Sequence, residues 1–265
     1  MAKKVVKSKK GELPVYSADG KASGSVSIPE VFNTPLRFDV IRRAVVAVES
    51  HDRQPYGPSP GAGMRHAVST WGKGRGAARV QRLTDGNTAA ESPNNVGGRR
   101  AHPPVVEKSY YKRFNRKEMA LARASALAAT GVVDIVRKRG HRFSEDISAL
   151  PVVVDDSVVK IDTTADAVEF LDAVGLYDDI IRAKEGKHIR AGRGKMRGRR
   201  YKVPRSILFV MDTDKPLARA IRNLPGVEVV PPTRLSVSDL APGGDPGRLV
   251  VMSTDVMRFF GGDSE

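Results

Sequence analysis

The sequence predicts an α/β fold: a mostly parallel sheet flanked by helices, with a long extended internal loop. From Leu150 onward, short runs that are apolar throughout alternate with helical patterns. Uniformly apolar strands separated by helices are typical of a parallel sheet that is covered on both faces. Between Arg53 and Lys108 this pattern stops, and glycine or proline recurs every few residues. We therefore expect one α/β domain over residues 1–265 with an extended loop inserted at 53–108.

Two helices are expected ahead of the regular alternation. The first begins at Asn33 as cap with Pro35 in its first turn. Its apolar side chains form one stripe: Leu36, Val40, Ile41 and Ala44. The second opens at Asn115, has Glu118 three residues later as in a capping box, and ends at Gly131.

The C-terminal half supplies the remaining elements. Apolar runs predict strands at 151–156, 206–212, 227–230 and 248–252. Helical patterns occupy 165–176, 177–184, 215–224 and 253–260, the last capped by Ser253 or Thr254.

The positive charge is concentrated in two segments. The chain of 265 residues has a net charge of +15, with 45 Lys and Arg against 30 Asp and Glu. The segment from Arg53 to Arg113 contains eleven Lys and Arg and three Asp and Glu, a net charge of +8. The segment from Arg182 to Arg205 contains eleven Lys and Arg and one Glu, a net charge of +10. The other residues therefore net −3. Such basic segments favour a polyanion, with nucleic acid ahead of an anionic membrane.

Other features of the composition narrow the class of protein. Without cysteine, disulfides, thiolate nucleophiles and cysteine-bound metals are excluded. The first residues are basic but lack the apolar stretch of a signal peptide, and no apolar window approaches the ~18 residues of a membrane span. We expect a soluble, intracellular protein with no membrane partner.

The predicted loop holds the only tryptophan. Trp71 lies among glycines beside Lys73 and Arg75, without apolar neighbours at periodic spacing. A possible two-turn helix at 76–83 would set Arg75, Arg79 and Arg82 on one face. A compact domain seldom contains a structureless loop beyond ~15 residues. A flexible linker is one interpretation; an arm that orders against RNA, anchored by Trp71 stacking on a base, also explains the tryptophan and the arginines.

The second basic segment spans 186–205. Its glycines oppose a helix, and in an extended chain Arg193, Lys195, Arg197 and Arg199 project to one side. Such a row matches the phosphates of a nucleic-acid backbone, and Tyr201 adds a ring for stacking on an unpaired base. A solvated charge run is the alternative, although such dense like charge repels itself without a counter-charge.

Enzyme motifs fail on inspection. Ser59 lies in a G-x-S-x-G match, but Pro60 after it has no N–H for an oxyanion hole. Gly194-Lys195 is followed by methionine instead of the serine or threonine of a P-loop. The five histidines lack metal-ligand spacing, and the acid pairs at 155–156 and 178–179 fit strand ends or helix caps. The sequence predicts no catalytic residue, metal or cofactor.

Six motifs together resemble the archaeal and eukaryotic branch of ribosomal protein L four, a family of the large subunit. They are WGKGRGAARV (71–80), GRRAHPP (98–104), ASALAAT (124–130) with RGHR (139–142), AGRGKMRGRR (191–200), NLPGVEVV (223–230), and LAPGG followed by GRLV (240–250). They occur in family order within a match from about Tyr16 to Phe260. The resemblance implies a structural, non-catalytic protein with an α/β body and a long loop. In the family this loop threads through large-subunit rRNA to the wall of the nascent-peptide exit tunnel.

The resemblance also implies partners and site residues. Expected partners are large-subunit rRNA, neighbouring ribosomal proteins including large-subunit protein twenty-two near the tunnel, and the nascent peptide, on cytoplasmic ribosomes. The candidate rRNA-binding residues are Arg65, His66, Trp71, Lys73, Arg75, Arg79, Arg82, Arg99, Arg100, His102, Lys112 and Arg113 in and beside the loop, and Arg190, Arg193, Lys195, Arg197, Arg199, Arg200, Tyr201 and Lys202 in the second segment. The candidate tunnel-proximal tip is Leu83, Thr84, Asp85, Gly86 and Asn87. An α/β RNA-processing enzyme and a messenger-RNA-binding regulator are the alternative functions.

Overall fold

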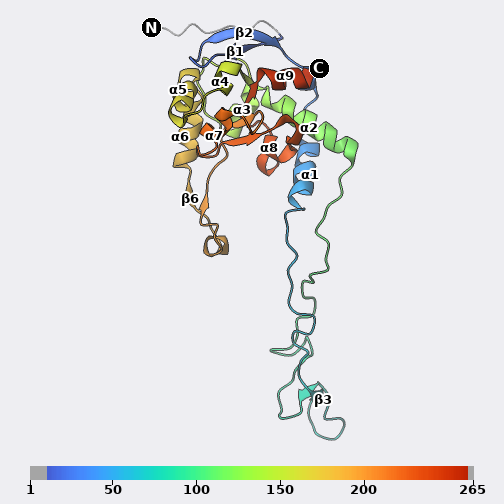
Figure 1. Ribbon diagram of the computed structural model, residues 1–265. Coiled ribbons are helices and arrows are strands. Elements are labelled where there is room, and N and C mark those ends of the chain that lie inside the picture. The colour runs from blue at the N-terminus through green and yellow to red at the C-terminus, as the bar shows by residue number, and fades with distance from the viewer. Residues whose placement is uncertain (1–10, 262–265) are drawn as a thin grey trace. The chain divides into compact units, whose positions relative to one another are not determined.

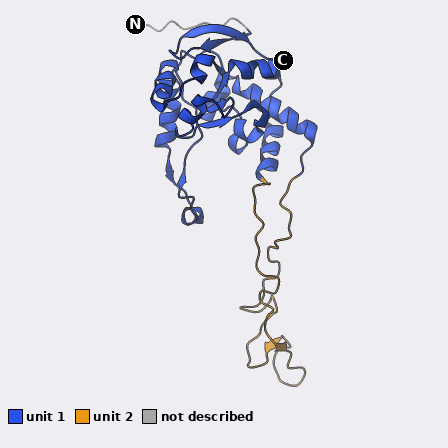
Figure 2. Ribbon diagram, in the orientation of Figure 1, with its two compact units in different colours: residues 1–49, 113–265 blue, residues 50–112 orange. Residues whose placement is uncertain are grey.

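A computed structural model describes residues 11–261 and divides the chain into two units (Figure 2). The first, called the body, comprises the chain up to Glu49 and from Arg113 onward; the second, called the arm, is Ser50–Lys112. The basic first ten residues, on which the expectation about a signal peptide rests, lie outside the described residues.

The body is built on a six-stranded sheet with the order β2-β1-β5-β10-β8-β9 (Figure 1). The strands are β1 (Glu12–Tyr16), β2 (Ala22–Ser27), β5 (Val152–Val154), β8 (Leu208–Val210), β9 (Glu228–Val230) and β10 (Val250–Ser253). All neighbours pair in parallel except β2, which is antiparallel to β1. The predicted mostly parallel α/β sheet is confirmed. The β1–β2 hairpin was not predicted, because the sequence ASGSVS of β2 has no apolar run.

Helices cover both faces of the sheet, so alternate side chains of each central strand pack into two hydrophobic cores, one on each face. Phe209 and Val251 pack into one core, with α3 (Val133–Arg139), α4 (Asp156–Val159), α5 (Thr164–Val174), α6 (Tyr177–Glu185) and α7 (Pro216–Ile221). Leu208 and Val250, one residue away on each strand, pack into the other, with α1 (Phe38–Glu49), α2 (Arg116–Thr130), α8 (Val237–Leu240) and α9 (Thr254–Gly261). Burial on both sides explains why these strands are apolar throughout.

The connection order explains why α8 lies opposite α7. The chain passes from β8 to the edge strand β9 and then returns past β8 to β10. Parallel crossovers are right-handed, so a connection that reverses direction places its helix on the other face. The carboxyl ends of the strands therefore form one side of the body and their amino ends the other.

The predicted start of the first helix was wrong. Asn33 ends a short 3-10 helix, Glu30–Asn33, and α1 begins only at Phe38. The Thr34 hydroxyl donates to the Val31 carbonyl oxygen at 2.7 Å, so the cap-like residues close the earlier turn. At the true start, the hydroxyl oxygen of Ser125 on α2 accepts from the Arg37 N–H at 2.7 Å. A side chain 88 residues away thus caps α1, which local sequence cannot reveal.

The second helix follows its prediction in extent, with Asn115 and Gly131 flanking it. No capping box forms, because the Asn115 side chain makes no cap hydrogen bond. Within residues 11–261 no single helix is long and apolar enough to cross a membrane, although α2 and α3, which meet at 91°, pass that test as a bent pair.

The paired acids at 155–156 and 178–179 have different roles. Asp155 caps α4, accepting from the Asp156 N–H at 2.8 Å, as its position before a helix predicts. Asp179 is fully buried in the first turn of α6 and receives hydrogen bonds from three partners. His141 Nδ1 lies 3.0 Å from one carboxylate oxygen; Arg182 Nε, at 2.8 Å, and the Arg142 N–H, at 2.9 Å, donate to the other. The interpretation of Asp179 as a helix cap was therefore wrong.

A second buried ion pair joins the sheet to α8. Arg248, two residues before the start of β10, is fully buried and donates to Glu228 of β9 and to the carbonyl oxygens of Ser206 and Asp239. Burial lowers the pKa of Arg248 to about 9, and the nearby charge of Arg205 acts in the same direction. Because its donors are shared among three segments, Arg248 fixes how the chain enters β8 and β10.

We predict that Asp179→Asn destabilises the body by about 3–5 kcal/mol, because it removes the buried carboxylate that balances the charge of the partly buried Arg182 and accepts the hydrogen bond of the Arg142 N–H. Chemical denaturation monitored by circular dichroism measures this change. Asp178→Asn, at the exposed neighbouring position of the same helix turn, is the matched control and should change stability by less than about 0.5 kcal/mol. Equal effects of the two substitutions would contradict the assignment.

The same network makes stability depend on pH. Burial lowers the pKa of His141 below 6.5, its value in an unfolded chain. Burial raises the pKa of Asp179, but hydrogen bonds from His141 and Arg182 outweigh it and hold that pKa below 3.8. As pH falls below 6.5 the unfolded chain therefore takes up a proton at His141 before the folded chain does, and stability decreases.

We expect His141→Gln to flatten the loss of stability between about pH 7 and pH 5, where one group contributes at most ~1.4 kcal/mol per pH unit. Denaturation curves across this range provide the measurement. His188→Gln, at an exposed histidine, serves as control and should leave the slope as in the parent. A parent protein whose stability is constant over this range would refute the prediction.

Candidate nucleic-acid interface

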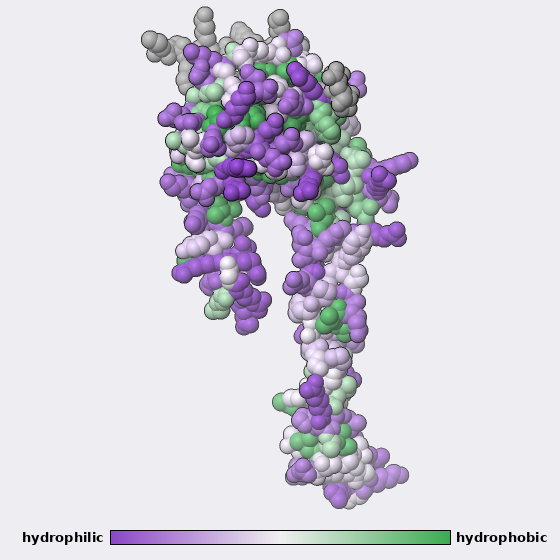
Figure 3. All heavy atoms as spheres, in the orientation of Figure 1, coloured by the Kyte–Doolittle hydropathy of each residue, from purple (hydrophilic) through white to green (hydrophobic). Residues whose placement is uncertain are grey.

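The second basic segment folds as a hairpin on the body, here called the basic hairpin (188–202). Its strands are β6 (His188–Ile189) and β7 (Tyr201–Lys202), which pair antiparallel. The Arg190 N–H donates to the Arg200 carbonyl oxygen at 2.8 Å and its Nε to the Arg199 carbonyl oxygen at 3.2 Å. The stretch holds seven Lys and Arg and no acid, and its surface is mostly hydrophilic in Figure 3.

The predicted one-sided row of cations was wrong. Arg193–Met196 forms a 3-10 turn at the tip of the hairpin, closed by the Arg197 and Arg199 N–H groups donating to the Gly194 carbonyl oxygen at 3.1 and 3.2 Å. Gly192 enters this turn with a φ of 76°. The cations consequently radiate from a compact tip. The Tyr201 ring lies beside two cations, with Lys187 Nζ 4.7 Å and Arg200 Cζ 5.8 Å from its centroid.

The arm begins as two extended limbs lying side by side, 50–57 and 104–112 (Figures 1 and 2). Stacking between His51 and Tyr111, with centroids 4.4 Å apart, joins them, as does Arg53 over the Tyr110 ring at 4.5 Å. The Lys112 N–H donates to the Ser50 hydroxyl oxygen at 3.0 Å. These limbs are thus held by ring and guanidinium contacts instead of a β-ladder.

A small sheet closes the end of the arm. β3 (Val68–Ser69) pairs antiparallel with β4 (Arg82–Leu83). The chain then turns back, with the Leu83 N–H donating to the Thr88 carbonyl oxygen at 3.0 Å and an isolated bridge from Arg82 to Ala89. The candidate tip residues 83–87 form this tight turn, and all but Leu83 are exposed.

Trp71 packs against arginines of its own arm. Arg75 Cζ lies 5.2 Å and Arg82 Cζ 4.8 Å from the Trp71 ring, within the range of cation–π attraction. Arg82 also donates to the carbonyl oxygens of Asn87 at 2.6 Å and Ala78 at 3.5 Å. Arg82 thus holds the arm's end through Nη1 and Nη2, whereas its Nε is buried without a hydrogen-bond partner, and Trp71 is half-buried.

The predicted two-turn helix at 76–83 does not form. Gly72, Gly74 and Gly76 have φ values of 70°, 87° and 62°, and a Cβ built at any of them would meet no atom within 4 Å. These glycines are therefore needed for left-handed backbone and not for space. The winding backbone brings Arg75 and Arg82 to the indole without a helix.

The remaining candidates lie mostly on the surface. Arg65 donates to the Ser59 hydroxyl oxygen at 3.0 Å. Arg99 is half-buried beneath Gly63, and Arg113 belongs to the body, one residue beyond the arm. The exposed residues of the candidate set are Arg65, His66, Lys73, Arg75, Arg79, Arg100, His102, Lys112 and Arg113 in and beside the arm, and Arg193, Lys195, Arg197, Arg199, Arg200, Tyr201 and Lys202 in the hairpin.

Within residues 11–261, the cations of the arm and of the basic hairpin have no ion-pair partner, whereas Arg205, at the end of the second basic segment, pairs with Glu228. Across residues 11–261, every ion pair that the structure forms lies in the body, and none includes a residue of the arm or of 188–202. The arm's own carboxylates, such as Asp85 and Glu91, are also outside any such pair. The structure thus presents the cations unneutralised.

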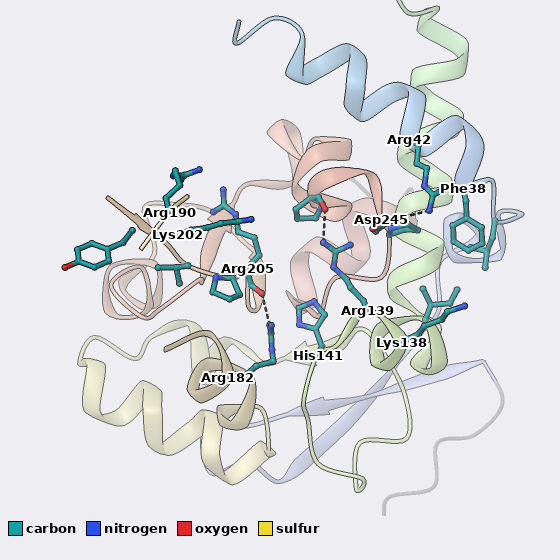
Figure 4. Close-up of a pocket in the computed structure, with 17 residues that line it drawn as sticks. Phe38, Arg42, Lys138, Arg139, His141, Arg182, Arg190, Lys202, Arg205 and Asp245 are labelled. Carbon is teal, nitrogen blue, oxygen red and sulfur yellow. Dashed lines mark hydrogen bonds and ion pairs between the residues drawn. The ribbon is translucent and has the colours of Figure 1, made fainter. Parts of the chain in front are cut away.

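Three further cations escaped the sequence analysis. Arg42, Lys138 and Arg139 line a cleft of about 1110 Å³ in the body, together with residues of the hairpin base (Figure 4). The run Arg137-Lys138-Arg139 at the end of α3, just before Gly140 in left-handed conformation, is the signal that could have drawn attention to it. Arg42 offers no such signal, since it lies on a helix whose sequence shows only an apolar stripe.

We predict that Arg82→Gln makes Trp71 more solvent-accessible, because it removes a cation–π contact and the charged hydrogen bond to the Asn87 carbonyl oxygen, which contributes about 1.5–3 kcal/mol. The free protein's tryptophan emission should shift to the red, and quenching by acrylamide should increase. The matched control is Arg79→Gln, an exposed arginine of the same arm, which should leave the emission unchanged. Identical spectra for the two variants would show that Arg82 does not hold the indole.

Comparison with known proteins gives this arrangement a family. A model of the ribosomal protein L4/L1 family matches residues 26–262. The chain is 50% identical over 248 residues to a large ribosomal subunit protein uL4 from Aeropyrum pernix, covering 93% of this chain and 90% of that protein. It is 49% identical over 247 residues to uL4 of Thermoplasma volcanium, with 93% and 96% covered. With uL4 of Archaeoglobus fulgidus it shares 44% over 247 residues, with 93% and 97% covered. The resemblance seen in the six sequence motifs is thereby confirmed, and the chain belongs to the ribosomal protein L4/L1 family, on the side of its archaeal members.

Proposed function

We propose that this protein is a structural constituent of the large ribosomal subunit and that it binds large-subunit rRNA through the arm and the basic hairpin. The observation that carries the proposal is the absence of any carboxylate paired with these cations in residues 11–261. Crowded like charges repel each other, and a phosphate backbone relieves the repulsion with release of counterions. The large-subunit proteins to which the chain is similar supply the kind of RNA.

The two segments offer different kinds of contact. The hairpin presents a compact cluster of cations with Tyr201 beside them, suited to phosphates and one unpaired base. The arm presents exposed Lys73, Arg79 and Arg100 around the partly exposed Trp71 ring. We assign Trp71 the role of an anchor that stacks on a base or sugar while the neighbouring cations bind phosphates. Arg82 then acts through Trp71, as a positioning residue.

The arm is also the part that reaches the nascent-peptide exit tunnel in this proposal. Its extended limbs and its closed end at residues 83–87 suit a segment that threads between RNA helices. The partners that follow are rRNA, neighbouring ribosomal proteins including large-subunit protein twenty-two, and the nascent peptide. The organisation is that of one α/β domain with an RNA-binding insertion at 53–108 and a second RNA-binding segment at 186–205, on cytoplasmic ribosomes.

An RNA-processing enzyme fits the body less well. Open parallel sheets bind substrates in the crevice at the carboxyl ends of their strands. There the structure has a small pocket of about 280 Å³, with Asp212 and Asp255 against the single cation Lys215. The basic hairpin and the large cleft lie by Arg205 and Pro246, just before β8 and β10, at the amino ends. A regulator that binds messenger RNA would use the same cations, and competition between the two RNAs distinguishes it.

We predict that replacing Arg193, Arg197 and Arg199 together by glutamine weakens binding to large-subunit rRNA and flattens its salt dependence by about one unit of slope for each lost contact. The parent protein, if it neutralises about 6 to 10 phosphates, should lose about 10³- to 10⁵-fold in affinity between about 50 and 200 mM salt. Filter binding across this salt range is the first measurement, and co-sedimentation with large subunits is the second.

A charge-matched control removes three exposed arginines elsewhere on the body: Arg219→Gln, Arg222→Gln and Arg258→Gln. This variant should bind rRNA with the parent's salt slope. If the hairpin variant behaves like this control, the hairpin faces solvent. If the parent binds messenger RNA and rRNA equally and does not sediment with large subunits, the ribosomal role fails.

A further inference from the structure

The body contains a basic cleft that combines the base of the second basic segment with residues outside both predicted segments. Its volume is about 1110 Å³. Three parts of the body converge on it in Figure 4: the start of α1 with Phe38 and Arg42, the end of α3 with Lys138 and Arg139, and the base of the hairpin with Arg190. The loop before β10 closes the remaining side. Segments far apart in sequence thus build one concave surface.

The charge of this cleft is strongly one-sided. Seven of its lining residues are lysine or arginine: Arg42, Lys138, Arg139, Arg182, Arg190, Lys202 and Arg205. The only carboxylate in the lining is Asp245. Asp245 is already paired with Arg42 at 3.0 Å. Four of these cations, Lys138, Arg139, Arg190 and Lys202, are in no ion pair with any residue of 11–261. The cleft therefore attracts an anion that the body does not supply.

Arg139 gives the cleft a specific unmet demand. Its Nη2 donates to the Pro242 carbonyl oxygen at 2.9 Å, whereas its Nη1 is buried and has no hydrogen-bond partner. Burial lowers the pKa of Arg139, and the charge of Arg248 acts in the same direction. A buried cationic donor without an acceptor is unfavourable. A small rotation of the guanidinium group toward an anion in the cleft would satisfy it.

The lining also includes apolar rings. Phe38 and Tyr201 are 42% and 51% exposed, and Pro204, Pro242 and Pro246 line the same cleft. Rings and proline faces accept a stacked base, whereas guanidinium and ammonium groups accept its phosphates. An acidic peptide would match only the cations.

The depth of the cleft favours an unpaired strand over a duplex. Arg139 and Arg190 are half-buried and His141 is buried, so these donors lie below the surface. In a duplex the bases are stacked inside and cannot enter a cleft, whereas single-stranded RNA can extrude a base with its flanking phosphates. Arg190, Tyr201 and Lys202 also belong to the basic hairpin, so one RNA segment can pass from its tip into the cleft.

We propose that the cleft binds an unstacked nucleotide of single-stranded RNA together with its flanking phosphates, as a third RNA contact beside the arm and the hairpin. This inference rests on the proposed function, since it takes RNA to be the ligand. The base lies against Phe38 and the proline walls, and Lys138 and Arg139 receive the phosphates. In this proposal the body itself recognises an unstacked nucleotide, in addition to supporting the arm and the basic hairpin.

The test uses the full chain and an RNA oligonucleotide of about 10 nucleotides, single-stranded or annealed to its complement. Lys138→Gln with Arg139→Gln should reduce the salt slope for the single strand by about 0.7 per lost phosphate, roughly 1.4 in all. Binding of the duplex should change little. Arg219→Gln with Arg222→Gln on α7, which contributes no lining residue, is the charge-matched control and should retain the parent slope.

A second variant keeps the test valid if the double variant folds poorly. Phe38→Ala removes an exposed ring and no charge, so it should weaken single-strand binding several-fold without changing the salt slope. Ultraviolet crosslinking of the parent to the single strand should place adducts at Phe38 or Tyr201.

Several outcomes would overturn the cleft. Equal slopes for the cleft and α7 double variants, equal losses for single strand and duplex, or displacement of the RNA by polyglutamate of matched charge would each do so. The hairpin variant separates the two proposals. If it weakens RNA binding while the cleft variants do not, only the cleft is refuted; if the parent binds neither oligonucleotide nor large-subunit rRNA, the proposed function fails as well.

Discussion

The constraint on which the rest of this structure depends is that, within residues 11–261, the cations of the arm and of the basic hairpin have no carboxylate paired with them. The residues outside 53–113 and 182–205 carry a net charge of −3, so the positive charge is concentrated in these two segments. Coulomb repulsion within such segments favours open conformations over a compact core. Each segment therefore has its own means of holding a defined shape.

The basic hairpin keeps its shape because two arginines of the body hold the chain at its base. Arg182 joins Asp179 of α6 to the Arg205 carbonyl oxygen, at 2.7 Å, where the chain leaves the hairpin for β8. Arg248 holds the next residue, Ser206, from the opposite strand. Both arginines are paired with buried or partly buried carboxylates and therefore stabilise the fold. The exposed arginines of the hairpin remain available to bind a ligand. Burial therefore distinguishes the cations that stabilise the fold from those that can contact a partner.

In the arm, cations and rings replace a hydrophobic core. Stacked His51 and Tyr111 join the limbs, and Trp71 with Arg82 orders the far sheet. A guanidinium that lies over a ring and donates to carbonyl oxygens keeps its charge while acting as packing material. The arm can thus be ordered and basic at the same time. An arginine also has two roles in the cleft: Arg139 donates to the Pro242 carbonyl oxygen and lines the basic surface.

The sequence by itself determined the α/β class, most strands and helices after Leu150, the location of both basic segments, and the family, because apolar periodicity, glycine and proline spacing and charge runs are local properties. It did not determine the cap of α1 by Ser125, the β1–β2 hairpin, the burial of His141 with Asp179, or the convergence of Arg42 and Lys138 on one cleft. It also led to two wrong conformations, a helix at 76–83 and an extended row at 193–199. In each case the deciding contact joins residues distant in sequence, or a left-handed glycine redirects the chain. Only the tertiary structure shows which cations are consumed by their own protein and which are left for a partner.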